Sequence, residues 1–495
     1  MASDQISIRA RTIAIVGAGP SGVIAAKYLR AEQAFDKIVL FEQRSRPGGI
    51  WNYTGDQRDE NLFSIPQTNP HQGHQQPEWV PVPSPPSADH VPNGDIDTDG
   101  PQKTPSFLSP MYEKLETNIP RGLMGFQDLC WPPESQLFPT HETVSKYIED
   151  YSADVQDLVQ YETQVTNVVP VDAINPTGAW TVTTLNLRTN TSTSSSFDAV
   201  IVANGHFIVP YIPDIPGIRE WNEQYPGRIT HSKYFRRPSE YKGKKVIVVG
   251  NSASGSDISA QIAPHCSTTT PLLWSTRSQS LFSQTHSDAP GTRNQRREVP
   301  QITRFLPSSS FYRGVQFADG TIESPIDAVV FATGYFYSLP FLSHLKPSLI
   351  TDGTHVEHTY KHIFYSPRPT LSFLALNQRV IPFPLAEAQA AVVSRVLSGR
   401  LALPSLPTLT DWEATYTKQN EISDPRNFHL LPFPRDAEYI NEMAGWALSA
   451  ERRDGLANEG QGKKPPVWGQ WEFWCRERFP AIRRAFGAVG EARRG

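Results

Sequence analysis

The chain has 495 residues, of which 38% are hydrophobic and 19% are charged, as is typical of a globular protein with two or three domains. Its 46 basic and 50 acidic residues give a formal net charge of −4, so nothing suggests a nucleic acid partner. The three cysteines, Cys130, Cys266 and Cys475, form no C-x-x-C pair, which argues against a disulfide framework, a zinc site and a dithiol redox centre.

The N-terminus is polar and leads directly into an apolar strand, unlike a signal peptide. No uninterrupted apolar run approaches the ~20 residues that a transmembrane helix needs. We therefore expect a soluble, cytoplasmic protein without an integral membrane segment.

The first segment, residues 12–56, has the pattern strand, glycine turn, helix, strand, which predicts one β-α-β unit of a parallel sheet. Its turn is GAGPSG. Gly17 permits the tight turn, Gly19 lets the backbone approach a pyrophosphate, and Gly22 lets the helix and strand pack closely. Pro20 and Ser21 open the helix, whose N-terminal N–H groups face the phosphates.

Glu42 ends the next strand, 20 residues after Gly22. A carboxylate in that position accepts hydrogen bonds from both ribose hydroxyls of a bound dinucleotide. The same charge would repel a 2′-phosphate, so this first site is expected to take FAD or NAD and not NADPH.

Residues 57–105 are rich in Pro, His, Gln, Asp and Gly and lack apolar periodicity. The composition predicts a poorly ordered surface insertion, with a lid over the active site as the alternative. His71 and His74 have no third ligand at suitable spacing, so we expect no metal site there.

The chain then returns to a globular composition, with a predicted helix near 140–151 and the strands TQVTNVVPV, AWTVTTL and FDAVIVANG. The phrases VIVANGH (200–206) and VVFATGY (329–335) are alike, so the chain is expected to leave one domain at the first and re-enter it at the second. We predict an α/β fold of two dinucleotide-binding Rossmann-like domains, with the NADPH domain inserted into the FAD domain. The expected parts are 1–211 (FAD domain, first part), 212–330 (NADPH domain) and 331–495 (FAD domain, second part, with a helical tail).

The second glycine motif is GNSASGSD, after the strand KKVIVV and before a predicted helix. A serine replaces the middle glycine, so the context supports the assignment more than the pattern does. The residues expected to contact the nucleotide are Gly250, Ser252, Ser254, Gly255, Ser256 and Asp257.

Arg277 follows the next strand, LLWSTRS, where the first unit carries Glu42. A guanidinium beside hydroxyl side chains suits a 2′-phosphate, which indicates NADPH. The alternative is an ordinary surface arginine. Two dinucleotide sites without a C-x-x-C motif suggest that hydride passes from NADPH to the flavin and then to dioxygen.

These residues resemble the flavin-containing monooxygenases, of a fungal type. The segment YPGRITHSKYF (225–235) is similar to the family fingerprint F-x-G-x-x-x-H-x-x-x-[Y/F], with Tyr225 in place of Phe. Phe235 stands where Baeyer–Villiger relatives usually carry Trp, which favours oxygenation of a heteroatom. For His231 in this segment we expect a packed structural role.

Two further segments carry the resemblance. GGIW resembles the family's flavin-contacting G-G-x-W and implies that Gly49, Ile50 and Trp51 bind the flavin. LETNIPRGLMGFQD resembles T-N-x-P…M-x-F-x-D, which places Thr117 and Asn118 beside the flavin, with Asn118 as the catalytic candidate. We also expect Val165 to contact the cofactor. The helix LAEAQAAVVSRVLSG is expected to begin near the pyrimidine edge of the flavin.

The resemblance implies an NADPH- and FAD-dependent monooxygenase that forms a flavin 4a-hydroperoxide and oxygenates a soft nitrogen or sulfur nucleophile of a small molecule, with secondary metabolism as one candidate setting. The alternatives are a Baeyer–Villiger or N-hydroxylating relative and, in another class, a non-catalytic redox-sensing flavoprotein. The tail at 468–494 mixes Trp and Arg, which predicts a helix docked on the FAD domain, with an amphipathic membrane-surface helix as the alternative. Neither the substrate nor the oligomeric state follows from the sequence.

Overall fold

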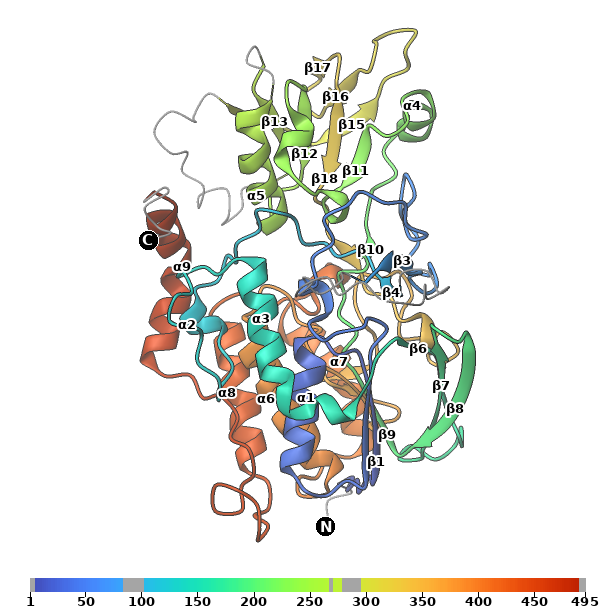
Figure 1. The fold of residues 1–495 in the computed structure, drawn as a ribbon, viewed down its shortest axis with the longest axis vertical. Coiled ribbons are helices and arrows are strands. Elements are labelled where there is room, and N and C mark those ends of the chain that lie inside the picture. Colours follow the sequence, from blue (N-terminus) through green and yellow to red (C-terminus); the bar gives the residue numbers. More distant parts are fainter. Residues whose placement is uncertain (1–4, 83–101, 267–269, 278–294, 489–495) are drawn as a thin grey trace, which may run out of the picture.

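The computed structural model describes residues 5–82, 102–266, 270–277 and 295–488. Two parallel sheets dominate it, one in each of two domains that lie one above the other in Figure 1. The chain passes between the domains twice, and these two passages pair as the antiparallel strands β10 (Val209–Pro210) and β19 (Tyr335–Phe336).

The first sheet combines both ends of the chain. Its parallel strands, in spatial order, are β22 (Leu371–Phe373), β9 (Ala199–Val202), β1 (Thr12–Val16), β2 (Lys37–Phe41) and β5 (Val159–Gln160). The short strands β20 (Thr359–Tyr360) and β21 (Phe364–Tyr365) extend it in antiparallel fashion.

Both faces of this sheet are covered, so its central strands β1 and β9 are almost wholly apolar. Along β1, Ile13 and Ile15 belong to the core on the helical side, whereas Ala14 and Val16 belong to the core on the other side. In Figure 1 the helices lie on one side of the sheet and a three-stranded meander lies on the other. The helices are α1 (Pro20–Ala31), α3 (His141–Ser152), α6 (Pro382–Leu397) and α8 (Arg435–Leu448), and the meander strands are β6 (Thr163–Pro170), β7 (Trp180–Asn186) and β8 (Thr191–Phe197).

The second sheet is wholly parallel and belongs to the inserted domain. Its order is β11 (Ile229–His231), β18 (Ala328–Phe331), β12 (Val246–Val249), β13 (Leu272–Ser275) and β14 (Arg296–Val299). The helices α4 (Ile218–Gln224) and α5 (Ala253–Ile262) and the small sheet of β15 (Ile302–Phe305), β16 (Val315–Phe317) and β17 (Ile322–Glu323) complete this domain. The predicted α/β fold with an inserted domain is confirmed. The phrase VVFATGY supplies the last strand of the inserted sheet, and the chain returns to the first domain only after β19.

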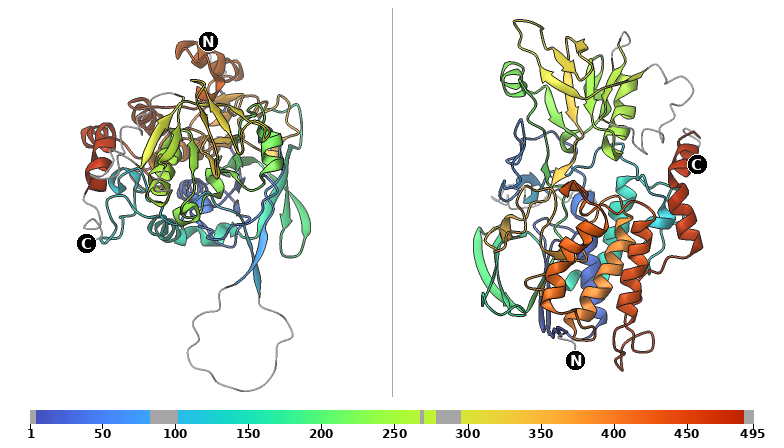
Figure 2. Two further views of the ribbon diagram at one scale, coloured as in Figure 1. Left: turned by 90° about the horizontal axis from the view of Figure 1, so that it is seen from above. Right: turned by 180° about the vertical axis from the view of Figure 1, so that it is seen from behind.

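The remaining helices lie on the first domain, as the view from behind in Figure 2 shows. They are α2 (Arg121–Met124), α7 (Leu406–Gln419) and α9 (Gln470–Ala488). The tail helix α9 docks through a buried ion pair between Arg476 and Asp436 of α8, whose Nε and Oδ2 atoms lie 2.6 Å apart. The expected docked helix is therefore present.

Residues 57–82 differ from the expectation of a poorly ordered surface segment. Leu62 is fully buried, and the backbone N–H and C=O of Gln67 both pair with Ile212 at 3.0 Å. Glu60 forms an ion pair with the buried Lys233 at 2.7 Å. The prediction failed because this stretch packs through isolated apolar side chains and polar contacts, which leave no apolar periodicity. It ends in β3 (Glu78–Pro81), which pairs with β4 (Lys103–Ser106); residues 83–101 lie outside the described part of the chain.

Candidate active site

Two of the three glycines in the first turn are required by the packing of the protein itself. Gly17 follows β1 with φ +99°, and a Cβ added there would lie 2.8 Å from the carbonyl oxygen of Ala203. A Cβ on Gly22 would lie 1.8 Å from the carbonyl oxygen of Gly17. Both positions exclude any side chain, whatever ligand is bound.

Gly19 is different. A Cβ added there would have no protein atom nearer than the Cα of Gly49, at 3.8 Å, so the protein alone leaves room for a side chain. Gly19 caps α1 without a side-chain hydrogen bond, and Pro20 occupies the first turn. The first N–H groups of α1 are thus available to an anion, and the space above Gly19 suits the close approach of a pyrophosphate. The residues present therefore fit FAD.

The GGIW segment lies directly on this turn. The N–H of Gly48 donates to the carbonyl of Ala18 at 2.9 Å, and a Cβ on Gly49 would lie 3.1 Å from the Cα of Gly19. Ile50 accepts a hydrogen bond from the hydroxyl of Ser109 through its carbonyl. The predicted flavin contacts Gly49, Ile50 and Trp51, which form one 3-10 turn, are thereby brought beside the predicted pyrophosphate site.

Glu42 at the end of β2 is 4% exposed and is bound to the same turn. Its Oε2 accepts from the N–H of Ala18 at 2.7 Å, and its Oε1 accepts from the N–H of Arg44 at 2.8 Å. A carboxylate has about four acceptor positions, so two remain for ribose hydroxyls. Val165 lies on the other side, buried in β6 within the core that contains Val16 and Phe41; its contact with the cofactor stays a prediction.

The segment around Asn118 is held by its neighbours and leaves the amide uncommitted. The backbones of Glu116 and Thr140 form an isolated antiparallel β-bridge, and the N–H of Thr117 donates to the carbonyl of Pro139 at 2.9 Å. The hydroxyl of Thr117 donates to the carbonyl of Ile119 at 2.9 Å. Asn118 itself is half-buried, and within the described ranges its side-chain amide makes no hydrogen bond to the protein. A positioned but unused amide is suited to contact a ligand.

The second glycine turn repeats the first at its outer positions. Gly250 has φ +114°, and an added Cβ would lie 2.4 Å from the carbonyl oxygen of Ala332. A Cβ on Gly255 would lie 2.0 Å from the carbonyl oxygen of Gly250. Between them, Ser252 caps α5 without a side-chain hydrogen bond and is exposed, as is Ser254, whereas Ser256 is buried. The exposed side chains open the N-terminus of α5 to a nucleotide.

Asp257 and Arg277 occupy different surroundings. The carboxylate of Asp257 accepts hydrogen bonds from the hydroxyl of Tyr112 and from Nε2 of Gln261, the latter at 2.9 Å, and burial raises its pKa. It therefore joins the two domains, and its predicted contact with the nucleotide stays a prediction. Arg277 is exposed two residues beyond the end of β13, where the carbonyl of Ser275 accepts from the N–H of Gly250 at 2.9 Å; its contact with a 2′-phosphate stays a prediction.

The fingerprint segment forms the junction between the domains. Lys233 is fully buried, and its Nζ contacts Glu60 Oε2 at 2.7 Å and the carbonyl of Ile208 at 2.5 Å. Arg236 is also fully buried and donates to the carbonyls of Thr54, Met111, Ser109 and Lys233. Burial lowers the pKa of Lys233 to about 8 and lowers that of Arg236.

His231 in the same segment is a structural residue. Its Nδ1 accepts from the N–H of Lys233 at 3.1 Å, and its side chain is buried against Tyr335. Burial lowers its pKa to about 3, so the imidazole is neutral at physiological pH. The sequence did not identify Glu60 or Arg236, because their partners lie far away along the chain.

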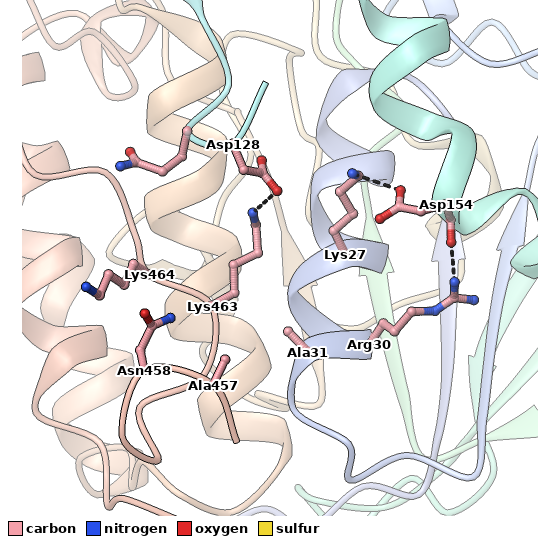
Figure 3. A pocket seen from close by; sticks show the side chains of 10 residues that line it. Lys27, Arg30, Ala31, Asp128, Asp154, Ala457, Asn458, Lys463 and Lys464 are labelled. Atoms are coloured by element: carbon pink, nitrogen blue, oxygen red, sulfur yellow. Dashed lines mark hydrogen bonds and ion pairs between the residues drawn. The ribbon is translucent and has the colours of Figure 1, made fainter. Parts of the chain in front are cut away.

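A pocket of about 460 Å³ lies away from this site, at the C-terminal end of α1 (Figure 3). The glycine turn is at the other end of this 12-residue helix, roughly 18 Å away. Three basic side chains of the pocket already have partners: Lys27 contacts Asp154 at 2.8 Å, Arg30 contacts Asp157 at 2.6 Å, and Lys463 contacts Asp128 at 2.7 Å. We therefore do not assign it to either nucleotide.

Comparisons with known proteins agree with this geometry. A family model described as Flavin-binding monooxygenase-like matches residues 104–290 and 303–446, and one described as an NAD(P)-binding Rossmann-like domain matches residues 15–80. The flavin-containing monooxygenase iboF of Amanita muscaria is 31% identical over 90% of this chain and 89% of its own length. The flavin-containing monooxygenase ustF2 of Aspergillus flavus is 30% identical over 95% of this chain and 98% of its own.

The solved structure of S-allyl-L-cysteine S-oxygenase from Allium sativum has a TM-score of 0.73 and 26% identity, and the match covers 99% of this chain and 95% of that one. A structure of cyclohexanone monooxygenase shares the fold at a TM-score of 0.53 and 14% identity. Across the described residues, we find no helix long and apolar enough to cross a membrane. The chain belongs to the flavin-containing monooxygenase family and is a flavin-dependent monooxygenase that uses FAD and NADPH.

Proposed function

We propose that this enzyme oxygenates a soft nucleophile, a nitrogen or sulfur atom, of a small molecule, with NADPH as the reductant and dioxygen as the oxygen source. FAD, when bound and reduced, supplies the activation of dioxygen and the transfer of one oxygen atom. The residues of the chain bind and orient the two cofactors and keep water from the reacting atoms.

The observation that carries the proposal is the free amide of Asn118 in a segment otherwise fixed by hydrogen bonds. A neutral amide donates a hydrogen bond without introducing a base. Such a group would protect an oxygenated flavin against loss of hydrogen peroxide, which a nearby proton acceptor would accelerate. Asn118 thus suits an enzyme that must hold activated oxygen until a nucleophile arrives.

Two observations favour a heteroatom over a ketone as the target. Phe235 is fully buried against Tyr112 and Tyr241, at the fingerprint position where Baeyer–Villiger enzymes usually carry Trp. The relative from Allium sativum is named an S-oxygenase, which supports sulfur. Nitrogen remains the second target to be assayed.

The test is NADPH consumption in air, with hydrogen peroxide monitored, across thioethers, thiols, amines and cyclic ketones. We expect a thioether or an amine to lower the peroxide released per NADPH and to yield a matching amount of oxygenated product. Product from a ketone alone would show a Baeyer–Villiger enzyme, and product from primary amines alone an N-hydroxylating one. Failure of NADPH to bleach the bound flavin would indicate a non-catalytic flavoprotein.

The role of Asn118 is tested by Asn118→Ala. Hydride transfer from NADPH does not need this amide, so the flavin should still bleach at the wild-type rate. Losing one neutral hydrogen bond in a dry site costs about 1–3 kcal/mol, which would speed the wasteful release of peroxide roughly 5–150-fold. Asn118→Asp should be at least as damaging, because it adds a negative charge beside an electron-rich ring. Wild-type coupling in Asn118→Ala would remove the proposed role.

A further inference from the structure

The C-terminal helix α9 reaches the Asn118 segment through one arginine. Nη2 of Arg483 lies 3.0 Å from Oε2 of Glu116, two residues before Asn118, and the side chains are only 15% and 11% exposed. The guanidinium also lies over the ring of Phe138, 4.8 Å from its centroid. Partial burial weakens the screening of this ion pair by water and salt.

Glu116 and Phe138 belong to the two chain segments that fix Asn118. Glu116 bridges to Thr140, and Thr117 donates from its backbone to Pro139, next to Phe138. Arg483 therefore contacts both of the paired segments, one through Glu116 and the other through Phe138. The other side of the same stretch is held by α5 of the inserted domain, where Asp257 accepts from Tyr112.

We propose that Arg483 is a positioning residue for oxygen transfer: through Glu116 and Phe138 it keeps the Asn118 amide in place. The inference rests on the role proposed above for Asn118. Hydrogen bonds weaken steeply with angle and distance, so a small shift of the segment would impair the protection of activated oxygen without affecting flavin reduction.

The chain offers a matched control on the same helix. Arg476 lies seven residues before Arg483, on the same helical face, and pairs with Asp436. This pair anchors α9 to α8 and makes no contact with the Asn118 segment. Arg476→Gln should therefore loosen the whole helix at least as much as Arg483→Gln does.

The experiment measures FAD occupancy, Tm, the anaerobic rate of flavin bleaching by NADPH, and peroxide released per NADPH at saturating substrate. Arg483→Gln is expected to raise the rate of peroxide release roughly 2- to 10-fold, less than Asn118→Ala, with bleaching unchanged. Arg483→Lys should recover part of the coupling, because lysine keeps the positive charge. The recovery should be incomplete, because lysine lacks the planar guanidinium with its several fixed donors. Arg476→Gln should lower Tm and leave coupling unchanged.

The double variant Asn118→Ala/Arg483→Gln should be no more uncoupled than Asn118→Ala alone, because Arg483 acts through the amide that is already missing. Additive uncoupling, or equal uncoupling by Arg476→Gln, would overturn the inference. So would normal coupling in Arg483→Gln when Asn118→Ala is uncoupled, although the proposed function would then stand. Normal coupling in Asn118→Ala would overturn both.

Discussion

The two glycine turns of this enzyme are built on the same plan, and of their three glycine positions only the middle one differs. Gly17 and Gly250 each lie against the carbonyl of an alanine that follows the neighbouring strand, and Gly22 and Gly255 each lie against the carbonyl of the first glycine. At the middle position the FAD turn has Gly19 and the NADPH turn has Ser252.

That difference separates the glycines that the fold requires from the glycine that a bound cofactor requires. The outer glycines are fixed by backbone contacts within the protein. The middle position has room in both turns, so its residue reflects how closely a cofactor approaches. We infer that FAD comes nearer to the backbone than NADPH does.

The largest effect is expected at the outer glycines. Gly22→Ala and Gly255→Ala would each place a Cβ within 2.0 Å of a backbone carbonyl oxygen. Each should lower the free energy of unfolding by about 3 kcal/mol, because backbone must move to relieve the overlap. Thermal unfolding of flavin-free protein checks this, and an unchanged Tm would contradict the account of the turn.

Gly19→Val should affect the ligand and spare the fold. The flavin-free protein should lose about 1 kcal/mol at most, since valine is a poor N-cap. A clash with the pyrophosphate of about 3 kcal/mol would weaken FAD binding roughly 150-fold. The measurement is flavin absorbance per protein after purification. Full occupancy in a folded Gly19→Val variant would refute the assignment of this turn.

Arg277→Ala tests whether the inserted domain binds the 2′-phosphate of NADPH. Charge-assisted hydrogen bonds to the 2′-phosphate are worth roughly 1.5–3 kcal/mol, or about 10–150-fold in apparent affinity. The variant should lose its preference for NADPH over NADH and use NADH as before. Equal losses with both nucleotides would mean that Arg277 is a structural residue.

The smallest effect is expected for Ser252→Gly, which makes the second turn like the first. The side chain is exposed and makes no hydrogen bond to the N-terminus of α5, so the KM for NADPH should change by less than about threefold. FAD occupancy should not change. A tenfold effect on NADPH would show that the serine hydroxyl binds the nucleotide directly.

The sequence predicted those parts of the molecule that depend on local pattern. The two β-α-β units and the helix now seen as α3 follow from periodicity and glycine spacing, and the inserted domain follows from the likeness of the segments 200–206 and 329–335. The outer positions of the two turns could be aligned because each of those four glycines has its own steric reason. Belonging to the flavin-containing monooxygenases was likewise predicted from short motifs and is confirmed.

The parts that were missed depend on contacts between distant segments. Nothing local distinguishes Glu60 from a surface acid, yet its partner Lys233 lies 173 residues away. The same holds for Arg483 and Glu116, separated by 367 residues. The hydrogen bond of Asp257 to Tyr112, which also depends on how the two domains meet, was not predicted, whereas its contact with a nucleotide stays a prediction.

The most direct test of the account is the fate of the oxygen atoms. The enzyme is turned over with NADPH under ¹⁸O₂ and a thioether or tertiary amine that lowers peroxide release. We expect one ¹⁸O atom in each product molecule and close to one product per NADPH. Product that carries oxygen from water, or NADPH oxidation that yields only hydrogen peroxide with every nitrogen and sulfur nucleophile tried, would contradict the proposed function.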